Sequence, residues 1–124
     1  MTKHVVIVGG GYTGTCAAIQ LSRHAQQPCE ISVVEQRTVV GRGLAYSAME
    51  PDHRLNAPDM VHFVTPEDQE ALRHWFEEQG GPAYDGQADP GDDVLFIRRG
   101  DFGNFLGEQF AAYQASNPSS STLA

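Results

Sequence analysis

The sequence has little positive charge. It contains 8 Lys and Arg residues against 16 Asp and Glu residues, which gives a formal net charge of -8. Proteins that bind nucleic acids neutralise phosphates with clustered Lys and Arg, so the composition predicts that nucleic acids are not partners of this chain. A small anionic ligand is still compatible with it, because backbone amides and helix ends bind anions without entering the charge count.

Long hydrophobic runs and paired cysteines are also missing. No apolar stretch approaches the ~20 residues that a membrane-spanning helix needs, and residues 1–4 lead into the first apolar run without signal-peptide features. We therefore expect a cytoplasmic chain that does not enter a membrane. Cys16 and Cys29 show neither C-x-x-C spacing nor a neighbouring group of zinc ligands. We expect them to be reduced packing residues, and we expect no metal site.

The chain does have a glycine-rich turn. Gly9-Gly10-Gly11-Tyr12-Thr13-Gly14 has the pattern G-x-G-x-x-G, follows the apolar run 5–8 and precedes a helical stripe of small residues that continues to Ala25. In such a strand-turn-helix unit, the first glycine permits the tight turn, the second lets phosphate approach the backbone, and the third lets helix and strand pack closely. The pattern predicts a dinucleotide pyrophosphate site at a helix N-terminus.

A second predicted strand ends at an acidic residue. The apolar run 31–34 is followed by Glu35, which lies about 20 residues after Gly14, as the dinucleotide-binding pattern requires. A carboxylate there can accept hydrogen bonds from adenosine ribose hydroxyls and would repel a 2′-phosphate. A right-handed crossover between two parallel strands is expected. The alternative is a glycine-rich turn in another kind of α/β protein, with Glu35 solvated.

The rest of the chain is predicted to hold two more helices. Residues 36–64 lack helical periodicity and form a long excursion rich in apolar and aromatic residues. Thr65 and Pro66 predict the start of a helix that ends at Gly80-Gly81, and Asp101 predicts the cap of a third helix. We expect a single unit over residues 1–116 with a flexible surface insertion over 82–93. Residues 117–124 are predicted to be a disordered tail.

Several further stretches carry a family resemblance. V-G-R-G-L-A-Y-S over residues 40–47, L-N-A-P over 55–58 and R-R-G-D-F-G-N-F-L over 98–106 accompany the glycine turn and Glu35. With them the chain resembles FAD/NAD(P)-binding flavoproteins of the glutathione-reductase structural type, and more narrowly a mostly uncharacterised bacterial branch. The resemblance covers residues 4–113 except 82–93. It implies an α/β, Rossmann-like FAD/NAD(P)-binding domain with a parallel sheet.

The resemblance also implies FAD in an extended conformation and an oxidoreductase class, with NAD(P)H as a candidate electron donor. Loop 41–46 would lie near the pyrophosphate or the ribityl chain. Arg42 would add positive charge there or lie solvated, and Asn56 would bind on the flavin side or serve as a turn residue. The predicted cofactor-binding residues are Gly9, Gly10, Gly11, Tyr12, Thr13, Gly14, Glu35, Gln36, Arg42, Gly43, Leu44 and Asn56. No catalytic residue and no particular small-molecule substrate is predicted.

The sequence departs from this family in length. Members run to several hundred residues and add further strands, whereas this sequence has 124 residues and only two evident core strands. A parallel sheet normally continues and is covered on both faces, so we expect an apparently truncated domain: an N-terminal fragment, a truncated gene product, or half of a split protein in which a second chain completes the sheet. Two other functions stay open. One is NAD binding, which the lack of a crossover helix after Glu35 disfavours; the other is a non-enzymatic nucleotide-binding or interaction module.

Overall fold

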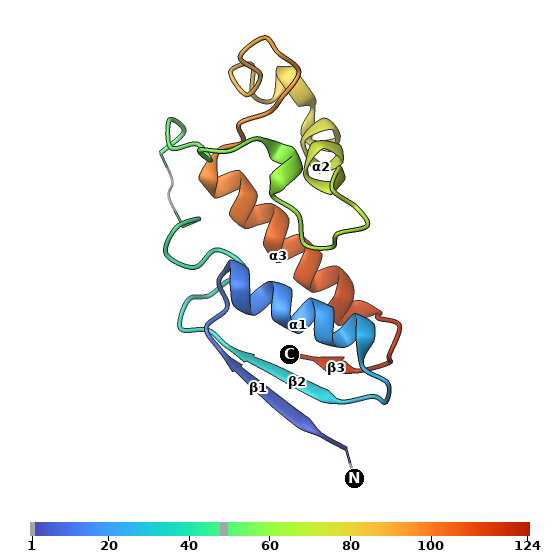
Figure 1. Cartoon of the computed structure of the whole chain (residues 1–124). Coiled ribbons are helices and arrows are strands. Elements are labelled where there is room, and N and C mark those ends of the chain that lie inside the picture. Colours follow the sequence, from blue (N-terminus) through green and yellow to red (C-terminus); the bar gives the residue numbers. More distant parts are fainter. Residues whose placement is uncertain (1, 48–49) are drawn as a thin grey trace.

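A three-stranded parallel sheet is the base of the molecule (Figure 1). The computed structural model describes residues 2–47 and 50–124. Strands β1 (His4–Val8), β2 (Glu30–Val34) and β3 (Thr122–Leu123) lie in the order β1-β2-β3, and both neighbouring pairs are parallel. Val and Ile dominate β1 and β2 because branched side chains suit a pleated surface. The predicted α/β, Rossmann-like fold with a parallel sheet is confirmed.

Two helices cover one face of the sheet. Helix α1 (Tyr12–His24) and helix α3 (Arg99–Ala115) lie on this face, and α2 (Ala71–Gln79) lies beyond α3, away from the strands (Figure 1). Under α1 and α3, Phe110 joins a buried cluster with Ile31 and Leu123 of the sheet. A larger buried cluster contains residues of α1, α2 and α3. The core therefore lies on one side of the sheet and continues outward between the helices.

The other face of the sheet has no described element upon it (Figure 1). Val6 and Val34 are each 54% exposed there, and Val8 is 84% exposed. Side chains alternate between the two faces of a strand, so Val5 and Ile7 point toward the helices while these valines point outward. The sheet thus has one covered face and one open face, on which these three valines lie.

The prediction of a disordered tail over 117–124 is wrong, because these residues include β3. The N–H of Thr122 donates to the Cys29 carbonyl at 3.0 Å, and the N–H of Val33 donates to the Ala124 carbonyl at 2.7 Å. Leu123 is buried against the sheet. The serine-rich run before it is held by the Asn117 side chain, which accepts a hydrogen bond from the Ser121 N–H at 2.9 Å. The serine-rich composition of the preceding residues therefore gave no indication of this third strand.

The third strand also changes how the chain crosses the sheet. Helix α3 directly precedes β3, so it serves as the second crossover helix that the sequence did not reveal after Glu35. The excursion and α2 are inserted between β2 and this helix. No helix in the described part of the chain is long and apolar enough to cross a membrane.

Both later helices begin at positions that differ from the prediction. Helix α2 starts at Ala71 rather than Pro66, because Thr65 closes a separate turn in which its carbonyl accepts from the Asp68 N–H at 3.0 Å. Helix α3 starts at Arg99, so Asp101 lies in its first turn and is not its cap. Two short 3-10 helices, η1 (Asp59–Val61) and η2 (Gly81–Ala83), complete the described elements.

Residues 82–93 are anchored to the core at two positions, contrary to the prediction of a surface insertion. Asp85 and Ala88 are 4% and 1% exposed. Both guanidinium nitrogens Nη1 and Nη2 of Arg54 donate to the Asp85 carboxylate at 2.8 Å, and Arg98 lies 3.4 Å from it. The hydrogen bonds from Arg54 hold the pKa of Asp85 below its usual value. This ion cluster joins the excursion, the 82–93 segment and the start of α3.

Candidate functional site

The glycine turn joins the end of β1 to the start of α1. Gly9 has φ of +101°, which glycine adopts readily, and its N–H donates to the Val34 carbonyl at 2.8 Å. A Cβ atom on Gly14 would lie 1.9 Å from the Gly9 carbonyl oxygen, so a side chain there is excluded. The turn therefore requires two glycines for two different reasons. Gly9 adopts a positive φ, and Gly14 allows α1 to approach the backbone of the turn closely.

The start of α1 presents free backbone donors beside this turn. Gly11 is the N-cap and supplies no side-chain cap, and the first turn contains no acidic residue. The first N–H bonded within the helix belongs to Thr15, which donates to the Gly11 carbonyl at 2.9 Å. The N–H groups of Tyr12, Thr13 and Gly14 consequently have no acceptor in the helix. Together with the helix dipole they favour an anion here.

Residues 40–46 run between the glycine turn and α3. The Gly41 N–H donates to the Gly10 carbonyl at 2.6 Å, and a Cβ on Gly11 would lie 3.5 Å from the Gly43 Cα. On the other side, a Cβ on Gly103 would lie 2.6 Å from the Tyr46 carbonyl oxygen. Glycine lowers the helix propensity of α3 at position 103, but the close approach of the Tyr46 carbonyl explains why a glycine stands there. The glycine lets the loop lie against the helix.

Two hollows adjoin the turn and share Val8, Gly9, Gly11 and Gly43. The first, of about 440 Å³, extends along the end of β2 and is also lined by Gly10, Val34, Glu35, Gln36 and Arg37. The second, of about 600 Å³, extends over the start of α1 and is also lined by Ile7, Tyr12, Thr13, Gly14, Ala17, Arg42, Leu44, Ala45 and Tyr46. The shared residues make them two ends of one cleft, which we call the glycine cleft.

Glu35 is fixed in the first of these hollows. Its Oε2 accepts a hydrogen bond from the Gly10 N–H at 3.2 Å, and its Oε1 accepts one from the Arg37 N–H at 3.3 Å. The Arg37 guanidinium lies 3.6 Å from Oε1, and the Glu35 side chain is 7% exposed. The carboxylate is thus held beside the turn by backbone donors before any ligand arrives.

Arg42 crosses from the glycine cleft to the start of α3. It donates to the Asn104 side chain, and with Arg98 it lines a third hollow of about 170 Å³. Among the buried side-chain nitrogens and oxygens of residues 2–47 and 50–124, only the Nε atoms of Arg42 and Arg98 lack a hydrogen-bond partner. Both free donors therefore belong to residues at one place, next to the glycine cleft.

Tyr12 connects the start of α1 to the excursion. Its hydroxyl donates to the Phe63 carbonyl at 2.5 Å, and its ring packs edge-on against Tyr46 with centroids 6.5 Å apart. Burial raises the pKa of Tyr12 to about 12 and also raises the pKa of the neighbouring Cys16 thiol. Tyr12 is therefore a neutral hydrogen-bond donor at physiological pH and holds residue 63 near the cleft.

The structure brings together eleven of the twelve predicted cofactor-binding residues. Asn56 is the exception: it is exposed and lines neither hollow of the glycine cleft. The prediction omitted Arg37 and Tyr46, which do line the cleft. Both residues could have been predicted from the sequence, because Arg37 follows Glu35 by two residues and Tyr46 ends the G-R-G-L-A-Y stretch. In the described part of the chain, no three His, Cys, Asp or Glu side chains are grouped so as to hold a metal ion.

Comparison with known proteins agrees with this geometry. The model of a family described as FAD-NAD(P)-binding matches residues 6–124. The match runs from within β1 through the glycine turn, β2 and the excursion to the end of β3. No curated protein matches the chain.

Proposed function

Because this chain belongs to the FAD-NAD(P)-binding family, we propose that it is the FAD-binding portion of a flavin-dependent oxidoreductase. The pyrophosphate of FAD would be held by Gly9 to Gly14 and the adenosine ribose by Glu35. When bound, the flavin supplies the redox chemistry, and the residues of the chain supply position and electrostatics. The free N–H groups at the start of α1 are the observation that carries this proposal.

The glycine cleft fits a diphosphate. The N–H groups of Tyr12, Thr13 and Gly14 lack helical acceptors, and Gly11 brings no side chain between them and the hollow. A diphosphate placed there would meet the positive end of α1 without a nearby acidic side chain of its first turn. The remaining predicted contacts of this half come from Arg42, Gly43 and Leu44, which line the same hollow.

The other half of the cleft suits an adenosine ribose. Glu35 Oε1 and Oε2 each have spare lone pairs beyond their single backbone hydrogen bonds, so the carboxylate can accept from ribose hydroxyls while it stays fixed. Gln36 lies beside it. A 2′-phosphate would bring negative charge against this buried carboxylate, which favours FAD or NAD over NADP at this position.

The inserted excursion favours FAD over NAD. Since α3 and β3 provide a crossover, the absence of one no longer argues against NAD. The insertion between β2 and α3 argues against NAD, because its residues 42–46 line the cleft beyond the proposed pyrophosphate position. Arg42 in this stretch also lines the third hollow, together with Arg98. The Arg42 side chain, which lines both the cleft and the third hollow, would add positive charge near the ribityl chain of an extended FAD. NAD(P)H remains the proposed electron donor, from a separate position.

Titration of the purified chain with FAD tests the proposal. We expect flavin fluorescence to be quenched on binding and the visible spectrum to shift. Gly11→Val places methyl groups between Gly43 and the free N–H groups, so FAD affinity should fall about tenfold or more, a loss of about 1.4 kcal/mol. Gly86→Val is the matched control, because Gly86 is exposed, lines neither hollow of the glycine cleft, and its Cβ would contact only the Pro82 carbonyl oxygen.

The same titration separates the alternatives. Binding of NAD without binding of FAD would support the NAD-binding function instead. Binding of neither would favour a non-enzymatic interaction module. FAD binding that Gly11→Val leaves unchanged would contradict the placement of the pyrophosphate at the glycine turn.

A further inference from the structure

Arg42 lies against α3, and two consecutive residues of that helix hold its side chain. The Nη2 atom of Arg42 donates a hydrogen bond to the side-chain oxygen of Asn104. A Cβ on Gly103 would lie 2.8 Å from the Arg42 Cγ, so the absence of a side chain at position 103 makes room for the stem of the arginine. Gly103 and Asn104 therefore hold both the stem and the guanidinium of Arg42.

The backbone next to Arg42 is held on two sides. Gly41 has φ of +108°, and a Cβ there would lie 2.8 Å from the backbone nitrogen of Gly107 in α3. On the other side, the Gly41 N–H donates to the Gly10 carbonyl at 2.6 Å. Arg42 thus starts from a backbone that is fixed between the glycine turn and α3, and its contacts with α3 set the direction of its side chain.

The guanidinium of Arg42 keeps its positive charge free of a carboxylate. Arg42 takes part in none of the ion pairs formed within residues 2–47 and 50–124, and its side-chain acceptor, Asn104, is neutral. Five other arginines do pair with carboxylates: Arg23, Arg37, Arg54, Arg73 and Arg98. A neutral acceptor orients a cation without cancelling its charge, whereas a carboxylate at the same position would form a charge-assisted pair with it.

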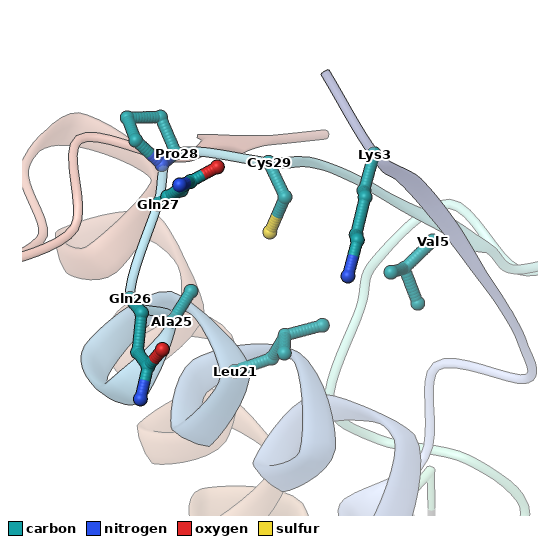
Figure 2. Close-up of a pocket in the computed structure, with 8 residues that line it drawn as sticks. All are labelled: Lys3, Val5, Leu21, Ala25, Gln26, Gln27, Pro28 and Cys29. Atoms are coloured by element: carbon teal, nitrogen blue, oxygen red, sulfur yellow. The ribbon is translucent and has the colours of Figure 1, made fainter. Parts of the chain in front are cut away.

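Arg42 lies at the end of α1 where an anion is favoured. It lines the second hollow of the glycine cleft together with Tyr12, Thr13 and Gly14 of the first turn of α1. At the opposite end of α1 there is a separate hollow of about 420 Å³, and Lys3 is its only charged lining residue (Figure 2). The helix dipole is positive at the first of these ends and negative at the second. An anion therefore gains from both Arg42 and α1 at the glycine cleft alone.

We propose that Asn104 is a positioning residue for cofactor binding: it holds Arg42 toward the FAD phosphate next to the ribityl chain and leaves the charge of the arginine available to that phosphate. This inference rests on the proposed FAD-binding function. Asn104 is exposed and lines neither hollow of the glycine cleft, so it acts through Arg42 and does not touch the cofactor. A guanidinium suits this position, because its planar set of donors matches phosphate oxygens.

Titration of variants with FAD, followed by flavin fluorescence, tests the proposal. Arg42→Met should lower FAD affinity about tenfold. Lys3→Met, which removes one positive charge at the other end of α1, should leave it unchanged. Asn104→Leu should lower FAD affinity about fivefold, whereas Gln114→Leu, the same kind of change at another exposed position of α3, should have no effect. In the Arg42→Met background, Asn104→Leu should cause no further loss, because the two residues act as a pair.

The stability of Asn104→Leu separates positioning from a structural role. Leu has a higher helix propensity than Asn, and position 104 is exposed, so this variant should unfold at the same urea concentration as the wild type or at a higher one. Equal FAD affinities for Asn104→Leu and Gln114→Leu would overturn the proposal, and so would a further loss in the Arg42→Met background. Failure of the wild type to bind FAD would overturn the proposed function itself, and this proposal with it.

Asn104→Asp keeps the test valid if Asn104→Leu does not fold. Aspartate has nearly the shape of asparagine and still accepts a hydrogen bond from Arg42, but its charge neutralises the guanidinium. FAD affinity should therefore fall several-fold. Gln114→Glu adds the same charge farther along α3 and should leave the affinity unchanged. A wild-type affinity for Asn104→Asp would show that FAD does not use the charge of Arg42, and it would overturn the proposal.

Discussion

The sheet end of the molecule and the end formed by α2 are held together in different ways. Around the glycine turn, close backbone contacts determine the structure, and they require glycines. Gly14, for example, packs directly on the Gly9 carbonyl. Around α2, charged side chains from distant segments meet: Arg54 bonds to Asp85, and Arg73 donates to Asp59 at 3.0 Å. The first kind of contact is encoded locally in the sequence. The second depends on residues that only the folded chain brings together.

The largest effect should come from breaking the glycine packing. Gly14→Ala places a Cβ 1.9 Å from the Gly9 carbonyl oxygen, and the backbone of β1 cannot move without losing its bonds to β2. Overpacking of this kind costs about 3 kcal/mol of unfolding free energy. Urea denaturation followed by circular dichroism measures it. A loss below about 1 kcal/mol would show that the turn tolerates a wider separation of α1 from the sheet.

Gly86→Ala controls for the general cost of replacing a glycine. A Cβ there would lie 3.4 Å from the Pro82 carbonyl oxygen, in ordinary contact. We expect its unfolding free energy to stay within about 0.5 kcal/mol of the wild type.

A smaller effect should come from breaking the ion cluster. Arg54→Met leaves Asp85, which is 3% exposed, without its bidentate partner. We expect a loss of about 2 kcal/mol, below the range for fully buried pairs because Arg54 itself is 20% exposed. Amide hydrogen exchange should rise mainly over residues 82–98 and little in β1 and β2. A uniform rise would contradict the division into two regions.

The acid stability of the chain sharpens the same test. Arg54 lowers the pKa of Asp85 in the folded state, so the stability that this carboxylate contributes is present above its unfolded pKa and is lost as pH falls through its folded pKa. Arg54→Met should therefore flatten the decline in stability below about pH 4. Arg23→Met is the control, because it removes an ion pair with a Glu67 side chain that is 61% exposed and should change stability by less than about 1 kcal/mol.

These two kinds of contact explain what the sequence could predict. The β1-turn-α1-β2 unit follows from adjacent residues, and its glycines and Glu35 line one cleft in the structure. The strand β3 was missed, because Thr122 and Leu123 follow a serine-rich run and are ordered only by their bonds to β2. The start of α2 was missed because Thr65 and Pro66 have the right types for a helix start but close a separate turn.

Gly103 joins the two regions, and its replacement should have a small effect on stability. Gly103→Ala gains about 1 kcal/mol of helix propensity, but its Cβ would lie 2.6 Å from the Tyr46 carbonyl oxygen and 2.8 Å from the Arg42 Cγ. Because the gain in helix propensity offsets part of the cost of displacing loop 41–46, the unfolding free energy should change by less than about 1 kcal/mol. The loop lines the glycine cleft, so FAD affinity should still fall several-fold.

Gly107→Ala provides the matched comparison one helical turn later. Its Cβ would lie 3.2 Å from the Val40 carbonyl oxygen, a milder contact with a residue that does not line the cleft. It should gain helix propensity with little loss of FAD affinity, measured by the same fluorescence titration. If the two variants bind FAD equally well, loop 41–46 does not control the cleft, and α3 stabilises the fold without shaping the site.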